Sequence, residues 1–84
     1  YTMIHIWGTD RLQHELWSFI DPEHPKYSPK MAAKWGERIE KYYEMIDARV
    51  GRLVEKAGEN AVVFVMSDHG FGPTHYFIDL NCWL

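Results

Sequence analysis

The feature that most constrains the fold is an apolar stripe through the middle of the chain. Six large side chains recur there at intervals of three or four residues: Trp35, Ile39, Tyr42, Ile46, Val50 and Leu53. That spacing places them on one face of a helix. Ser28 can cap the free N–H groups at its start, and Pro29 fits the first position, where a missing N–H costs nothing. Gly58 is a natural C-terminal stop, so we expect one long helix between Ser28 and Gly58.

Two other stretches are typical of β-strands. Residues 1–7 mix β-branched, aromatic and aliphatic side chains and stop at Gly8. Residues 61–66 read AVVFVM, an uninterrupted apolar run. Such runs are typical of strands that are covered on both faces in a parallel sheet. The sequence therefore predicts a strand at each end of the long helix.

A short helix is expected between the first strand and the long helix. Leu12, Leu16 and Phe19 recur there at helical spacing, and Thr9 or Asp10 could cap it. The element order is then strand, helices, strand, and a parallel strand pair needs the crossover that the long helix supplies. The predicted fold class is α/β, a right-handed βαβ unit of a mostly parallel sheet with flanking helices.

This unit would be incomplete, because its helices leave the other face of the sheet bare. The chain also opens without a methionine and closes on an apolar NCWL. We therefore expect residues 1–84 to be an internal part of one larger domain. A bare sheet face favours self-association of the isolated chain.

Composition excludes several classes of function. The formal net charge of −3 gives no basic footprint for nucleic acid, and no apolar run approaches the roughly 20 residues that span a bilayer. Cys82 is the single cysteine, so there is neither a disulfide framework nor a cysteine zinc site. A lone cysteine is compatible with a reducing compartment such as the cytoplasm.

Each predicted strand is followed by an aspartate and a histidine. Asp10 and His14 are four residues apart, which places them on one face of a helical turn. Asp68 and His69 are adjacent and precede Gly70, and we expect the glycines there to permit the bend that aims both groups at one point. Since the carboxyl ends of parallel strands share one sheet edge, the two pairs should lie together.

Two such pairs suggest two divalent metal ions, which clamp the oxygens of a phosphoryl displacement. Mixed oxygen and nitrogen ligands suit zinc, with manganese or iron possible. Neither pair completes a site, because zinc normally takes at least three protein ligands. His5 is expected to pack within the first strand, and His24 to be a solvated loop residue. His75 lies close enough to Asp68 to be a ligand or substrate contact, although a loop role is favoured.

The motifs TDRLQHELW, VVFVMSDHGFGP and IDLNCWL together resemble the alkaline phosphatase superfamily. The branch that they resemble most is the type I phosphodiesterase/nucleotide pyrophosphatase group. The resemblance implies a large α/β fold and two metal ions, usually zinc. Asp10 and His14 match two ligands of one ion, and Asp68 and His69 match two ligands of the other. The remaining ligands and the Thr or Ser nucleophile match nothing in this sequence.

The mechanism that the resemblance implies is in-line attack on phosphorus by the missing hydroxyl, activated by the metal on Asp68 and His69. The metal on Asp10 and His14 would activate water to hydrolyse the phospho-enzyme. The substrate would be a small phosphorylated molecule, and these 84 residues alone should not turn it over. The alternatives are another branch, such as phosphoglycerate mutase or sulfatase, and a non-catalytic metal-binding or structural α/β module.

Overall fold

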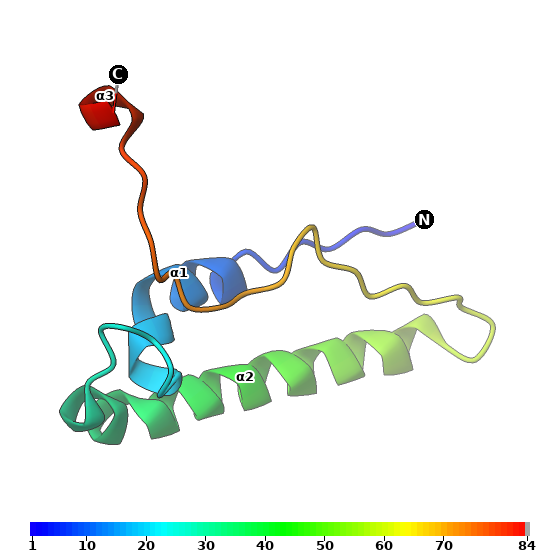
Figure 1. Ribbon diagram of the computed structural model, residues 1–84. Helices are drawn as coiled ribbons and strands as arrows, with labels where there is room; N and C mark the ends of the chain where they lie inside the picture. Colours follow the sequence, from blue (N-terminus) through cyan, green and yellow to red (C-terminus); the bar gives the residue numbers. More distant parts are fainter. Residues whose placement is uncertain (84) are drawn as a thin grey trace.

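The computed structural model describes residues 1–83, which contain three helices (Figure 1). They are α1 (Gly8–Ile20), α2 (Pro29–Ala57) and the single turn α3 (Leu80–Trp83). α1 lies beside the N-terminal half of α2, and the two helices pack on each other. Residues 58–79 cross α1 without regular structure and carry α3 away from the helix pair (Figure 1).

The long helix agrees with the sequence prediction at both ends. The Ser28 hydroxyl accepts a hydrogen bond from the backbone N–H of Met31 at 3.4 Å, and Pro29 is the first helical residue. The helix ends at Gly58, whose φ of +81° lies in the region that favours glycine. The N-terminal part of its apolar stripe lies beside α1, whereas Leu53 near the other end is 44% exposed. Within residues 1–83 Ile39 is the one buried side chain, 4% exposed.

The short helix begins earlier than its predicted caps. The chain is already helical at Trp7, and no side chain caps this end. Thr9 donates its hydroxyl to the carbonyl of Ile6 at 3.1 Å, so it does not serve the free N–H groups. The prediction of a cap at Thr9 or Asp10 is therefore wrong. Asp10 instead occupies the first turn, where the positive end of the helix dipole stabilises its carboxylate.

Close contacts hold α1 against α2. Gln13 donates from Nε2 to the hydroxyl of Tyr43 at 2.7 Å. Gly8 packs against Tyr42 so closely that a β-carbon at position 8 would overlap the tyrosine hydroxyl. The absence of a side chain at Gly8 therefore permits the approach of the two helices.

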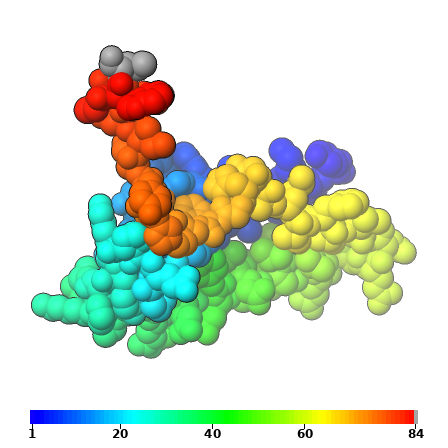
Figure 2. All heavy atoms as spheres, viewed as in Figure 1, coloured from blue at the N-terminus to red at the C-terminus, as the bar shows by residue number. Residues whose placement is uncertain are grey.

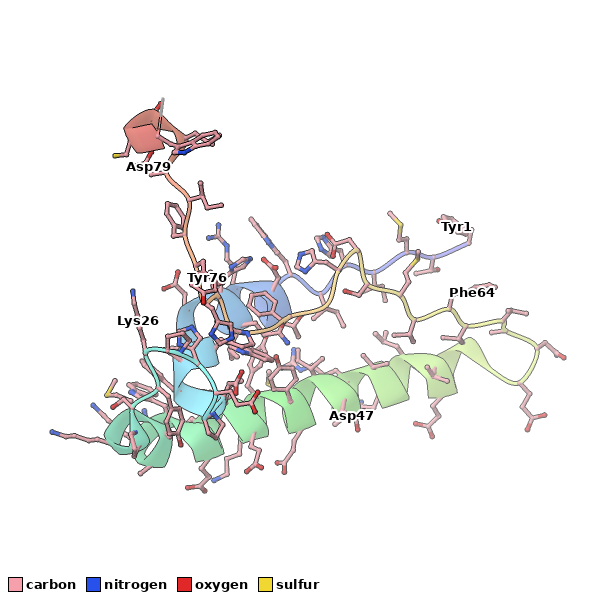
Figure 3. All side chains as sticks on the ribbon, in the orientation of Figure 1. Tyr1, Lys26, Asp47, Phe64, Tyr76 and Asp79 are labelled. Carbon is pink, nitrogen blue, oxygen red and sulfur yellow. The ribbon has the colours of Figure 1, made fainter. Side chains whose placement is uncertain are left out.

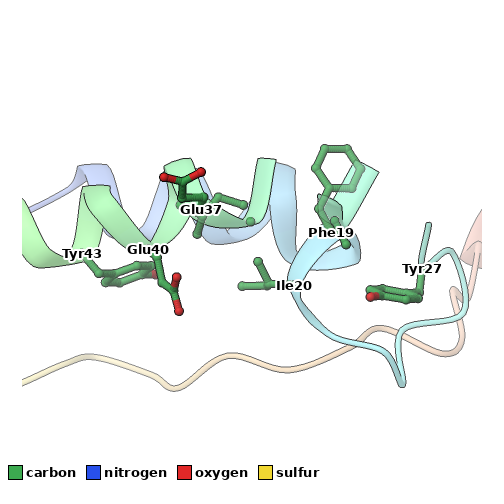
Figure 4. Close-up of a pocket in the computed structure, with 9 residues that line it drawn as sticks. Phe19, Ile20, Tyr27, Glu37, Glu40 and Tyr43 are labelled. Atoms are coloured by element: carbon green, nitrogen blue, oxygen red, sulfur yellow. The ribbon is translucent and has the colours of Figure 1, made fainter. Parts of the chain in front are cut away.

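A surface hollow lies between the end of α1 and the first turns of α2 (Figure 4). Its lining is mostly apolar and aromatic, with two glutamates: Phe19, Ile20, Tyr27, Ala32, Gly36, Glu37, Ile39, Glu40 and Tyr43. None of the four predicted metal ligands lines it. The hollow therefore belongs to the packing of the helix pair and is separate from the predicted metal centre.

The predicted βαβ unit is wrong for this structure. Residues 1–83 contain no strand, and residues 1–7 and 61–66 form no ladder with each other. The side chains of Val62, Phe64 and Val65 are more than 80% exposed, and Figure 3 shows Phe64 pointing away from the helices. Two strands alone are only marginally stable in water. A parallel pair also needs a long crossover, and ordering that crossover costs entropy before any strand pairing forms. Because residues 1–83 supply neither a third strand nor a second helical layer, the apolar run stays exposed.

The yellow and orange part of the C-terminal segment lies on the outer surface of the helix pair, whereas its red end projects away from the helices (Figure 2). Within residues 59–83 every residue is exposed except Phe71 and Pro73, which are half-buried. This much exposed apolar surface is consistent with self-association, which remains a prediction. Among the described helices, none combines the length and the apolar character that crossing a bilayer requires.

Candidate metal centre

The first predicted pair lies on one face of α1. Asp10 Oδ1 is 3.4 Å from His14 Nε2, the separation that an i,i+4 pair on a helix permits. The Asp10 side chain is 33% exposed and that of His14 is 60% exposed. Because both residues belong to a regular helix, the helix backbone itself fixes their relative position.

The second predicted pair lies where the exposed chain bends at Asp68. Ser67 supports the bend by donating its hydroxyl to the carbonyl of His69. Gly70 and Gly72 do not have a positive φ, since Gly58 is the one glycine in residues 1–83 that does. The expectation that glycine backbone freedom makes this bend is therefore not met, because local hydrogen bonding forms it within ordinary backbone angles.

The imidazole of His69 is oriented by its own neighbour. Nδ1 lies 2.8 Å from the carbonyl oxygen of Gly70, so Nδ1–H is the donor. Nε2 then faces two carboxylates, at 3.7 Å from Asp10 Oδ1 and 3.8 Å from Asp68 Oδ1. Histidines that bind metals commonly donate their second ring N–H to a carbonyl or carboxylate in this way.

The same surroundings favour the protonated form of His69. The hydrogen bond to the Gly70 carbonyl raises the pKa of His69 above 6.5, and the charge of Asp68 adds to this effect. Burial opposes these two effects in part, and Asp10 raises the pKa by a still smaller amount. A metal ion at Nε2 would therefore have to displace a proton that the two carboxylates help to hold.

The three contacts join all four predicted ligands in the order His14, Asp10, His69, Asp68. Ligand atoms held about 2 Å from one tetrahedral ion lie about 3.3 Å apart, close to these separations. The donor set of two carboxylates and two imidazoles also suits zinc. Yet within residues 1–83 no three His, Cys, Asp or Glu side chains surround a common point that could hold an ion. The arrangement is a string of pairs, and each pair offers two ligands.

Phe71 joins the two pairs, and the sequence reading gave it no role. Its ring lies 4.8 Å from that of His14 between centroids, nearly perpendicular to it, and 5.3 Å from that of Trp17. It also lies 6.1 Å from the ring of His69. An aromatic residue directly after SDHG was the available signal, but a single ring in a loop has no periodicity that predicts its partner.

The remaining histidines lie outside this cluster. His5 is exposed instead of packed in a strand. His24 accepts a hydrogen bond at Nδ1 from the N–H of Lys26 at 3.0 Å, which makes it a turn residue. His75 is exposed and forms no ion pair with a carboxylate in the described chain. Cys82 is a free, exposed thiol beside Asp79.

Comparison with known proteins places the chain in one family. No curated protein and no solved structure matches the sequence. The sequence profile of the type I phosphodiesterase / nucleotide pyrophosphatase family matches residues 1–84, the whole length given. The aspartates and histidines that meet at α1 thus lie inside the matched region. The chain belongs to the type I phosphodiesterase / nucleotide pyrophosphatase family.

Proposed function

We propose that this chain supplies half of a two-metal centre in a hydrolase that cleaves phosphodiesters or nucleotide pyrophosphates. Membership of the family supports the class of reaction. The observation that carries the proposal is the position of Asp10, whose Oδ1 lies within 3.7 Å of both His14 Nε2 and His69 Nε2. Two pairs that are far apart in the sequence thereby meet at one place.

Asp10 and His14 would hold one divalent ion, and Asp68 and His69 would hold the other. Zinc suits this donor set best, with manganese or iron as alternatives. When bound, such ions neutralise charge on the phosphoryl group and make water a stronger nucleophile at neutral pH. The nucleophile and the remaining ligands would come from other parts of the protein, and the substrate would be a small phosphorylated molecule.

The residues of this chain would orient the ligand atoms. The α1 backbone holds the Asp10 carboxylate next to the His14 imidazole. The Gly70 carbonyl fixes the ring of His69 so that its Nε2 points at the two carboxylates. Both imidazoles would thus present Nε2 as the ligand atom, with the proton on the ring nitrogen away from the ion.

The test uses the full-length natural protein that contains this sequence. Zinc content and hydrolysis of bis-p-nitrophenyl phosphate are measured for the wild type, His14→Ala and Asp68→Ala. We expect two zinc ions per wild-type chain, and each substitution should remove an ion and abolish most of the activity. The 84-residue chain alone should bind metal weakly and should not turn over the substrate.

His75→Ala is the matched control, because His75 is an exposed histidine of the same segment outside the string of pairs. It should retain wild-type metal content and activity. A wild-type protein without metal or activity would contradict the proposal and leave a non-catalytic module as the remaining reading. Equal loss in His75→Ala would also contradict it, because the effect would then not be specific to the four ligands.

A further inference from the structure

Phe71 is the point at which the exposed C-terminal segment attaches to the helices. Within residues 59–83 only Phe71 and Pro73 are partly covered, and all other side chains are exposed. The ring of Phe71 contacts Trp17 and His14, which are neighbours on α1 at i and i+3. It is also two residues from His69, whose ring it approaches at 6.1 Å.

The geometry of these contacts is that of attractive aromatic pairs. Ring centroids separated by about 4.5–7 Å with tilted or perpendicular planes are favourable, because the positive edge of one ring meets the negative face of the other. The three pairs of Phe71 have centroid separations of 4.8, 5.3 and 6.1 Å and interplanar angles of 82°, 42° and 48°. The ring thus contacts one histidine of each half of the centre.

The charged contacts are poorly suited to hold the segment in place by themselves. The Asp68 side chain is 88% exposed and that of His69 is 52% exposed. Exposed pairs at 3.7–3.8 Å contribute little, because water screens them and two side chains must be ordered. Apolar contact with Trp17 is the stronger means of bringing His69 to Asp10.

We propose that Phe71 is a positioning residue, which holds the Asp68–His69 pair against α1 and so sets the spacing between the two halves of the metal centre. The inference rests on the proposed function, since it assigns a role within the same centre. Phe71 itself binds no metal and acts through the two imidazoles. The alternative is that the ring only covers apolar surface on α1.

The experiment compares Phe71→Leu, Phe71→Tyr and Phe77→Leu with the wild type in the full-length protein. Leucine keeps apolar volume on α1 but removes the aromatic edge, and tyrosine keeps the ring. Phe77 is the matched control, because it is 91% exposed in the same segment. Titrations with Zn²⁺ and Co²⁺ give affinity and stoichiometry, and the visible spectrum of bound Co²⁺ reports the ligand geometry.

We expect Phe71→Leu to weaken metal binding by about tenfold to a hundredfold, as loss of the residues that orient ligands does. Its Co²⁺ spectrum should change, whereas Phe71→Tyr and Phe77→Leu should resemble the wild type. Wild-type affinity and an unchanged spectrum in Phe71→Leu would overturn the proposal. An equal loss in Phe77→Leu would also overturn it, because the effect would then not belong to the contact with α1.

A measurement without metal separates this inference from the proposed function. The ring-proton NMR signals of His14 and His69 should both move in Phe71→Leu, because each ring loses an aromatic neighbour. If the wild type binds no metal, the proposed function fails and these signals still decide whether Phe71 holds the two rings together. Unchanged signals would show that the segment does not dock through Phe71, and would overturn the inference.

Discussion

The two halves of the candidate centre are built in different ways. Asp10 and His14 lie one turn apart on a helix, and that helix is packed against α2. Asp68 and His69 lie on an exposed segment without helix or strand, attached to α1 through Phe71. The Asp10 side chain is 33% exposed, against 88% for Asp68. The helix half is set by local backbone geometry, whereas the other half depends on a tertiary contact.

The two pairs should therefore respond to different perturbations. Changes in the α1–α2 packing should disturb Asp10 and His14 together with the helix that carries them. Changes in residues 67–71 should leave the helices intact and disturb only the approach of His69 to Asp10.

Ile39→Ala should have the largest effect, because Ile39 is the one buried side chain of the described chain. Loss of a buried isoleucine costs about 2–5 kcal/mol, which is a large part of the stability of a small chain. Urea unfolding followed by circular dichroism measures the change. Leu53→Ala is the control, because Leu53 is 44% exposed on the same helix and should cost about 1 kcal/mol or less. Equal losses in the two variants would show that α1 is not held at Ile39.

Asp10→Asn should weaken zinc binding by about a hundredfold, and Asp68→Asn by about tenfold, within the range seen for disturbed metal sites. The reason is that Asp10 approaches both imidazoles, whereas Asp68 approaches only that of His69. Isothermal titration with zinc gives both affinities in the full-length protein. A larger loss of zinc affinity in Asp68→Asn than in Asp10→Asn would mean that Asp68 and His69 hold the metal by themselves.

Gly8→Ala should destabilise the helix pair by about 1–3 kcal/mol, because the added β-carbon overlaps the Tyr42 hydroxyl. Tyr42→Phe removes that hydroxyl and should restore most of the loss in the double variant. Gly51→Ala is the control, since Gly51 lies within the C-terminal part of α2 and a β-carbon there meets no atom within 4 Å. It should stabilise the chain by about 0.5–1 kcal/mol. Thermal melts of the four variants test these expectations. A melting temperature of Gly8→Ala above that of the wild type would disprove the overlap.

The smallest expected effect is that of pH on the docking of Asp68 and His69 against α1. The Gly70 carbonyl and the charge of Asp68 raise the pKa of His69 above 6.5 within the segment itself, and Asp10 on α1 adds a smaller increase. Docking favours the protonated imidazole only through that smaller increase. The contribution of the protonated His69 imidazole to docking should be complete below pH 6.5. It should be lost as the pH rises through the raised pKa. NMR titration of the metal-free chain gives this pKa directly. A value at or below 6.5 would contradict the contacts of His69 with Gly70 and Asp68, and a pKa that does not fall in Asp10→Asn would contradict docking on α1.

Asp68→Asn sharpens the same titration. The pKa of His69 should fall but stay above 6.5, because the Gly70 carbonyl is the larger cause of the shift. Zinc binding should change in the opposite sense to docking, since the metal competes with the proton for Nε2 and binds better as the pH rises. An unchanged pKa in Asp68→Asn would mean that the carboxylate does not face the ring.

The local part of the structure could be predicted from the sequence. The bounds of α2 follow from Ser28, Pro29 and Gly58, because capping depends on residues next to each other in the chain. The closeness of Asp10 and His14 follows from helical spacing in the same way. These predictions needed no knowledge of what lies beside the helix.

The non-local part could not be predicted in this way. Residues 61–66 have the composition of a buried strand, but a strand forms only where other strands and a covering layer are present. The contact between Phe71 and Trp17 could likewise not be predicted, because it depends on the tertiary path of residues 58–71 back to α1. The meeting of the two pairs was expected at a sheet edge, whereas in the structure they meet at α1.

The contact between Phe71 and α1 has a consequence for the order of folding. It closes a loop that contains the whole of α2. α1 and α2 are joined only by residues 21–28, so they can associate first. The entropy of closing such a loop grows slowly with its length, by about 0.6 kcal/mol for each doubling. Residues inserted between Gly58 and Ser67 should therefore delay the meeting of the two half-sites while costing little in the final state. The centre would assemble last, on helices that are already in place.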